Sequence, residues 1–162
     1  MSLIKNIYDS YRRPAKVYQS FVTDYFEEKT ALGFLAGGCL MAFISRWPTA
    51  ARDAHLSDQA LDMVLGGALF AWIFIAPLMF YAFAGFLTLV LFIGGLKDIG
   101  LTVRLSLFWS FLAATPWMLL YGLADGFFGP VILTTFIGIV WFGVFLWFLA
   151  CAFRALREGA DG

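Results

Sequence analysis

The chain has 162 residues and no formal net charge, and 62% of its residues are hydrophobic while 14% are charged. Soluble globular domains contain about 45–50% apolar and about 25% charged residues, so this composition excludes an ordinary soluble protein. A chain without net charge also lacks the basic field that binds nucleic acid, and we expect no nucleic-acid partner.

Residues 1–30 alternate polar and apolar side chains at helical spacing. Pro14 lacks an N–H and suits the first turn of a helix, so we expect two short helices joined near Arg13. Basic residues flank the apolar face, which favours an amphipathic cytoplasmic segment at the membrane surface. The alternative is a helix pair that packs under the rest of the protein, because Asp24 and its acidic neighbours weaken attraction to anionic lipid.

The first membrane span is predicted over residues 31–47. It contains small residues, Gly37 among them, which let helix backbones approach closely. Trp47 stands where an interfacial aromatic residue belongs. Residues 48–61 are expected to form a polar loop in which Pro48 opens a short helical turn.

The second span is predicted over residues 61–95, and residues 66–93 contain no charged residue. One long helix kinked at Pro77 is the simpler interpretation, because the middle of the segment contains nothing that builds a turn. Two shorter spans remain an alternative. Gly66 is a candidate packing position, and Gly94 with Gly95 is expected to end the helix.

The third span is predicted over residues 101–123, with a second kink at Pro116. Ser106 and Ser110 lie one turn apart on one face, with Thr115 nearby, and this small, weakly polar stripe suits packing against another helix. Residues 124–130 form a short connection. The fourth span is predicted over 131–152, the membrane domain extends to residue 157, and residues 158–162 form a tail.

The distribution of cationic residues predicts how the chain is oriented. With four spans and a cytoplasmic N-terminus, nine of the 11 Lys and Arg residues lie on the cytoplasmic side, as the positive-inside rule requires. The cytoplasmic set is Lys5, Arg12, Arg13, Lys16, Lys29, Lys97, Arg104, Arg154 and Arg157, and the opposite set is Arg46 and Arg52. Both termini are therefore expected in the cytoplasm of a bacterial cell, with the spans in its inner membrane.

The run LFIGGLKDIGLTVRLSLFWSFLAATPWMLL resembles a recurring unit of the Yip1 family, in which a Gly-Gly turn leads through a polar link into a span with a central Pro. The matching positions are Gly94, Gly95, Thr115 and Pro116. YRRPAKVYQSF and WFGVFLWFLACAFRAL are similar to the ends of small bacterial members, and the middle resembles compact alphaproteobacterial forms. Eukaryotic relatives have five spans and act with Rab GTPases. This chain is expected to have four, so that role is not carried over.

Few side chains suggest chemistry. No ionisable residue lies deep in a predicted span, which argues against an ion- or proton-coupled transporter. His55 stands near Asp53 and Ser57 in the expected outer loop, but adjacency in sequence is not the geometry of a catalytic triad. We therefore expect no catalytic residue, no cofactor and no metal site.

These patterns predict an all-α, polytopic transmembrane helix bundle of four spans with an N-terminal amphipathic cytoplasmic segment. The leading functional hypothesis is a non-enzymatic membrane protein that binds membrane lipid, other membrane proteins or a second copy of itself. One alternative is a small permease for an apolar or zwitterionic solute. Pro77 and Pro116 would shape its path, and Ser106, Ser110 and Thr115 would be its few polar contacts. Another is an accessory subunit of a larger membrane complex.

Overall fold

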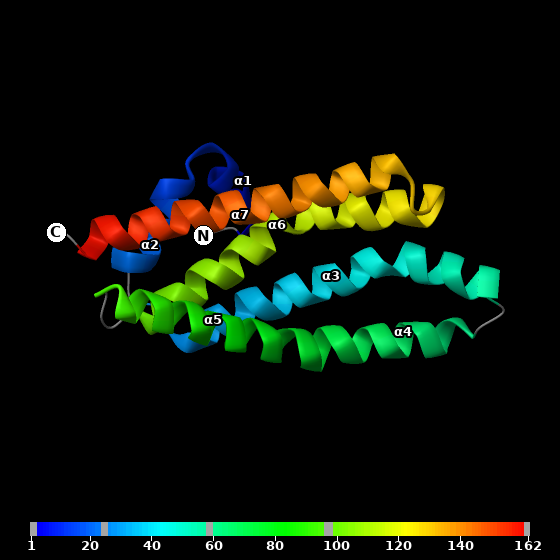
Figure 1. The fold of residues 1–162 in the computed structure, drawn as a ribbon, viewed down its shortest axis with the longest axis horizontal. Coiled ribbons are helices and arrows are strands. Elements are labelled where there is room, and N and C mark those ends of the chain that lie inside the picture. Colours follow the sequence, from blue (N-terminus) through cyan, green and yellow to red (C-terminus); the bar gives the residue numbers. More distant parts are fainter. Residues whose placement is uncertain (1–2, 24–25, 58–59, 96–98, 161–162) are drawn as a thin grey trace.

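The computed structural model describes residues 3–23, 26–57, 60–95 and 99–160, with side chains undescribed at the outermost positions of some helices. Within these ranges the chain is an all-α bundle (Figure 1). Four helical stretches are long and apolar enough to cross a membrane, namely Glu28–Ser57, Leu61–Ile93, Gly100–Phe128 and Ile132–Arg157. The predicted bundle of four spans is thus confirmed at the level of length and composition.

Two short helices precede the spans, α1 (Leu3–Arg12) and α2 (Pro14–Thr23), and they meet at Arg13 as the sequence predicts. Both lie against the bundle. The Tyr18 side chain is fully buried and Phe21 is 6% exposed. Tyr11 also packs edge-on against Phe148 of α7 (Ile132–Ala160), with 5.1 Å between ring centroids.

The first span, α3 (Glu28–Ser57), continues ten residues beyond its predicted end, so residues 48–57 are helical and the predicted loop there is wrong. Pro48 removes one backbone hydrogen bond without stopping the helix. At this point Pro48 packs closely against Gly126 of α6 (Gly100–Phe128). A helix of 30 residues is about 45 Å long, so α3 is longer than a hydrocarbon core of about 30 Å.

The second span is one continuous helix rather than two spans. It comprises α4 (Leu61–Phe70), a five-residue π-helix η1 (Ala71–Ile75) and α5 (Ala76–Ile93). The irregularity lies directly before Pro77, which cannot donate to the carbonyl four residues earlier. The helix ends at Ile93, and Gly95 then adopts a φ of 94°, a left-handed conformation that suits glycine.

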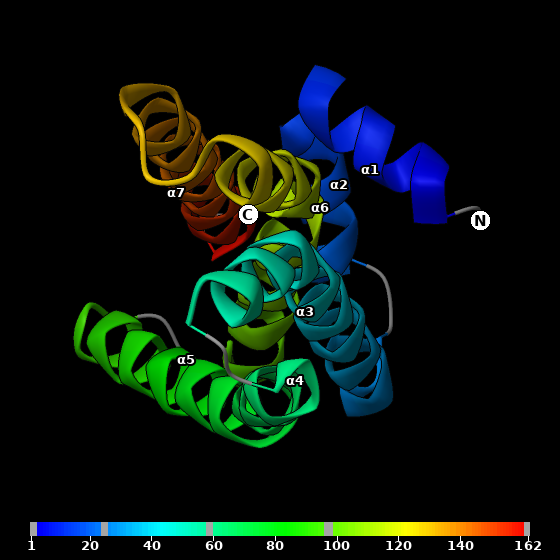
Figure 2. The same cartoon turned by 90° about the vertical axis from the view of Figure 1, so that its right-hand side faces the viewer.

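The third and fourth spans are α6 (Gly100–Phe128) and α7 (Ile132–Ala160). The predicted connection 124–130 is too long, because α6 continues through Asp125 and Gly126 to Phe128. Viewed along the molecule, α6 lies centrally, with α3, α5, α7 and the α1–α2 pair around it (Figure 2). The first half of α6 is consequently the core of the protein, and every residue from Leu105 to Thr115 is buried.

Candidate functional site

Two hydrogen-bond relays attach the N-terminal helices to α6. The indole N–H of Trp109 donates to Ser10 Oγ at 2.9 Å, and Ser10 donates to the Asn6 carbonyl at 2.8 Å. The Ser110 hydroxyl donates its proton to the Ser106 carbonyl, so the Tyr18 hydroxyl is the donor in the 2.7 Å bond to Ser110 Oγ. Each relay ends on a backbone carbonyl, so neither leaves an unpaired proton in the core.

The Pro116 kink is satisfied by hydroxyl groups from two elements. A proline has no N–H for the carbonyl four residues earlier, and its ring disturbs the next bond in the helix, so the carbonyls of Leu112 and Ala113 need other donors. Thr115 Oγ1 donates to Leu112 O at 2.7 Å, and the Tyr11 hydroxyl of α1 donates to Ala113 O at 2.9 Å. A side chain from outside the four spans therefore completes the backbone of the central one.

Burial keeps both of these phenols protonated. Desolvation raises the pKa of Tyr11 above its ordinary value, although a hydrogen bond with Trp117 acts in the opposite direction. Desolvation also raises the pKa of Tyr18, more strongly, because that side chain is completely enclosed. Both hydroxyls consequently remain donors across the physiological pH range.

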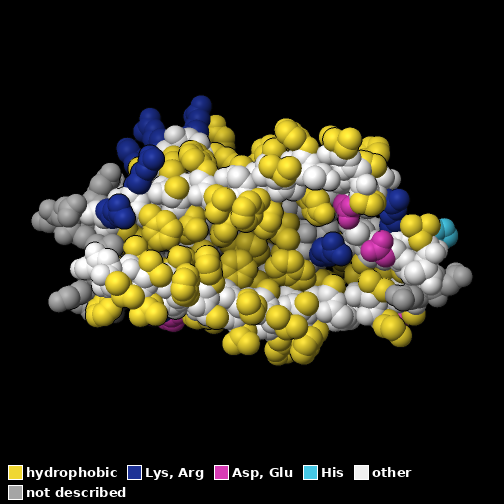
Figure 3. All heavy atoms as spheres, viewed as in Figure 1, with side chains coloured by type: hydrophobic (Ala, Val, Ile, Leu, Met, Phe, Trp, Pro, Cys, Tyr) yellow, Lys and Arg dark blue, Asp and Glu magenta, His cyan; other side chains and the backbone are white. Residues whose placement is uncertain are grey.

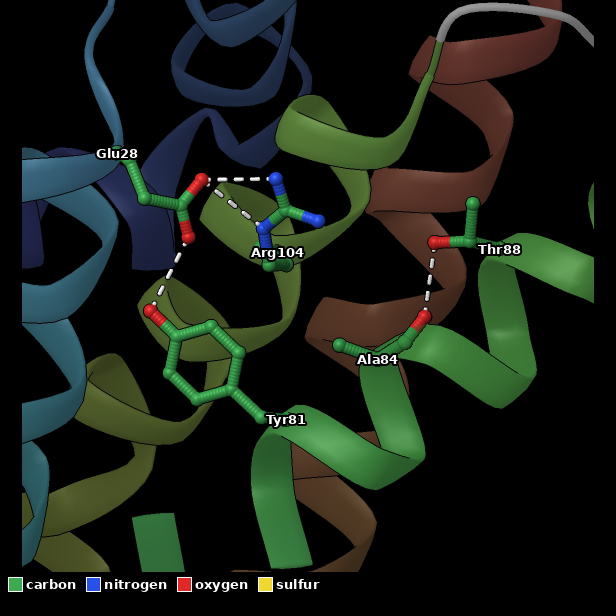
Figure 4. A network of polar contacts seen from close by, with 5 residues as sticks. All are labelled: Glu28, Tyr81, Ala84, Thr88 and Arg104. Atoms are coloured by element: carbon green, nitrogen blue, oxygen red, sulfur yellow. Dashed lines mark hydrogen bonds and ion pairs between the residues drawn. The ribbon is translucent and has the colours of Figure 1, made fainter. Parts of the chain in front are cut away.

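A second polar cluster joins three spans near the starts of α3 and α6. Glu28 Oε2 accepts from Arg104 Nε at 3.1 Å and from Arg104 Nη2 at 2.8 Å, while Glu28 Oε1 accepts from the Tyr81 hydroxyl at 3.1 Å (Figure 4). The carboxylate and guanidinium side chains are 48% and 31% exposed. The pair is therefore reachable from outside the bundle.

At the opposite end, α3 and α6 approach at backbone distance. A Cβ on Gly122 would overlap the Ser45 carbonyl, and one on Gly126 would overlap Pro48. Thr49 Oγ1 donates to Asp125 Oδ2 at 3.0 Å across the same interface. Gly122 and Gly126 form a G-x-x-x-G pair, which is the spacing typical of close helix contacts in membranes.

An apolar groove of about 410 Å³ lies between α3 and the second span. Its α3 wall runs from Leu32 to Phe43, and its other wall runs from Leu69 to Pro77 and includes the π-helix. All of its lining side chains are apolar. The groove was not predicted from the sequence.

The predicted positions are scattered through the structure rather than gathered into one site. Ser106, Ser110 and Thr115 are buried in the first half of α6, and Pro116, which follows directly, is exposed. A Cβ on Gly37 would make ordinary contact with Leu112 at 3.5 Å. Gly66 faces open space, Pro77 lines the groove, and Gly94 with Gly95 forms the turn after α5.

The remaining polar residues do not assemble a reactive centre among the described positions. Ser57 Oγ donates to the Asp53 carbonyl at 2.6 Å, and His55 is exposed. Within the same ranges, no three His, Cys, Asp or Glu side chains lie close enough together to hold a metal ion.

Functional residues missed by the sequence reasoning are Ser10, Tyr11 and Tyr18, Glu28, and the glycines at 122 and 126. The G-x-x-x-G spacing of the last two was a usable signal.

Comparisons with protein-family models, with curated proteins and with solved structures found no match.

Proposed function

We propose that this chain is a non-enzymatic, multi-pass protein of the bacterial inner membrane, of the Yip1 type, which binds or organises other membrane components. The observation that carries the proposal is the exposure of the second span. In its most apolar window only 6% of the residues are buried within the protein, against 61% for α6. One face of this helix packs against α3 and α6, and the rest of its surface is available to lipid or to a partner helix.

The use made of the internal hydroxyl groups supports binding over transport. A permease would need polar contacts along its path, and Ser106, Ser110 and Thr115 are the candidates that the sequence offers. All three are buried, and Ser110 and Thr115 donate to backbone carbonyls of α6. At the Pro116 kink, the Ala113 carbonyl likewise accepts a hydrogen bond from the Tyr11 hydroxyl and is not available to line a solute path.

The cation distribution supports an orientation with both termini in the cytoplasm. Lys and Arg side chains gather at the end of the molecule that carries α1, α2 and the C-terminal end of α7, and apolar side chains cover the middle (Figure 3). The start of α3 and the end of α7 lie at this same end (Figure 1). The excess of cations there agrees with the positive-inside rule.

Affinity purification from native membranes through a C-terminal tag tests the proposal. The expected result is a membrane component retained in a constant ratio to the protein. Leu78→Ser on the exposed face of α5 should lower that ratio, whereas His55→Ala, also exposed but at the end of α3, should not. Specific hydrolytic or transfer activity of the purified protein would overturn the proposal. A solute flux in proteoliposomes that the double variant Ser110→Ala/Thr115→Ala abolishes would favour a permease instead.

A further inference from the structure

The groove between α3 and the second span has the form of a site that opens sideways. Its floor contains the buried Leu35 and Cys39, together with Trp72 of the π-helix, whose ring stacks on Phe111 with 6.3 Å between centroids. Leu32 and Ile73 stand at its rim and are 52% and 53% exposed. An apolar, half-open groove within two candidate spans faces the region that hydrocarbon chains would occupy.

The volume of the groove restricts its occupant. A helix about 10 Å across fills roughly 420 Å³ in a single turn, so the groove holds no more than one turn of a partner helix. Pockets that enclose small molecules range from about 300 to 1,000 Å³, and this groove falls among them. A thin, flexible hydrocarbon chain suits it better than a helix.

The polar cluster of Glu28, Tyr81 and Arg104 lies at one end of this groove. Glu28 precedes the lining residue Leu32 by one turn of α3, and Tyr81 follows the lining residue Pro77 by one turn of α5. The bond between Tyr81 and Glu28 bridges the two walls at that point (Figure 4). The cluster contains one cation and one anion, so its net charge is zero. Both side chains are partly exposed.

We propose that this groove and cluster together bind a zwitterionic diacyl phospholipid of the phosphatidylethanolamine type. One acyl chain occupies the groove, the phosphate faces the Arg104 guanidinium, and the ammonium faces the Glu28 carboxylate. Arg104 bonds Glu28 through Nε and Nη2, and Nη1 points away from that carboxylate, which leaves guanidinium N–H groups for a phosphate (Figure 4). This lipid proposal rests on the proposed function, because the lipid is the membrane component that the protein would bind.

Native mass spectrometry of the full chain in mild detergent, titrated with phosphatidylethanolamine or phosphatidylglycerol, tests the site. Ala36→Trp fills the groove from an exposed position and should therefore leave the fold intact. We expect it to weaken phosphatidylethanolamine binding by about tenfold or more, which corresponds to displacing roughly two methylene groups. Ala82→Trp, exposed on α5 and outside the groove, is the matched control and should bind as the parent does.

The headgroup is tested by the double variant Glu28→Gln/Arg104→Gln, which removes both charges together and leaves neither unpaired. It should still bind lipid but lose the preference for phosphatidylethanolamine over phosphatidylglycerol. Equal binding by the parent and Ala36→Trp would overturn the groove assignment, and a parent preference for phosphatidylglycerol would overturn the headgroup assignment. These titrations measure lipid binding to purified protein. A failure of the lipid proposal is therefore distinguishable from a failure of the proposed function, which would appear as no component retained from native membranes or as an enzymatic activity.

Discussion

The attachment of α1 and α2 to the central helix gives the sharpest quantitative prediction. The triple variant Ser10→Ala/Tyr11→Phe/Tyr18→Phe removes three side-chain hydrogen bonds between these helices and α6, at 2.9, 2.9 and 2.7 Å. A buried hydrogen bond contributes about 1 kcal/mol net, so the variant should favour undocking by about 3 kcal/mol. Since about 1.4 kcal/mol is a factor of ten, the open population should rise by roughly 100-fold.

Trypsin measures this opening at the Arg12–Arg13 bond, because the protease binds extended backbone and the docked junction is held in a turn by the bond from Arg13 N–H to the Asp9 carbonyl at 2.7 Å. At low protease concentration the cleavage rate follows the open population, so cleavage at this junction should accelerate by about two orders of magnitude. Tyr8→Phe is the matched control, since Tyr8 is 57% exposed and its ring contacts Arg12 rather than α6. Cleavage of the triple variant within about twofold of the parent would refute the reasoning, because bonds of the usual strength would then have no effect on docking.

Three further outcomes are expected. Gly122→Ala should lower the melting temperature in detergent, because the added methyl group overlaps the Ser45 carbonyl. Gly66→Ala should leave the melting temperature unchanged or raise it, since that position faces open space and alanine favours helix over glycine by about 1 kcal/mol. Equal effects of the two changes would contradict the close packing of α3 against α6. Burial raises the pKa of Tyr11 and Tyr18, so the docking of α1 and α2 should be fully stable below about pH 10 and weaken as the pH rises further. Tryptophan fluorescence follows this loss, which should be smaller in the double variant Tyr11→Phe/Tyr18→Phe. An unchanged pH profile of that variant would assign the loss to other groups. Reporter fusions at the C-terminus should show cytoplasmic activity, and periplasmic activity would reverse the orientation inferred from the cations.

The sequence predicted those parts of the fold that depend on local pattern. Hydropathy located the four spans, and the glycines at 94 and 95 marked the end of α5 because a left-handed residue there favours glycine. Pro14 likewise indicated the junction of α1 and α2. These features follow from residues close together in the chain.

The polar contacts could not be predicted in the same way. Tyr18 and Ser110 are 92 positions apart, and Glu28 and Arg104 are 76 apart, so their pairing depends on how the helices are arranged. The end of α3 was misplaced because Pro48 was interpreted locally, while the packing that sustains the helix comes from Gly122 and Gly126. Only that glycine spacing was visible in advance, but the predicted span ended at residue 123, which left Gly122 in the span and Gly126 in the connection.

The position of the amino-terminal helices has a consequence for biogenesis. Ribosomes synthesise α1 and α2 before the residues that receive them, which are Ser110 and Ala113 on α6 and Phe148 on α7. These two helices therefore remain without their final contacts until α6 and α7 have been synthesised. A nascent chain arrested before α6 would leave the exposed Arg12 and Arg13 undocked and accessible to proteases.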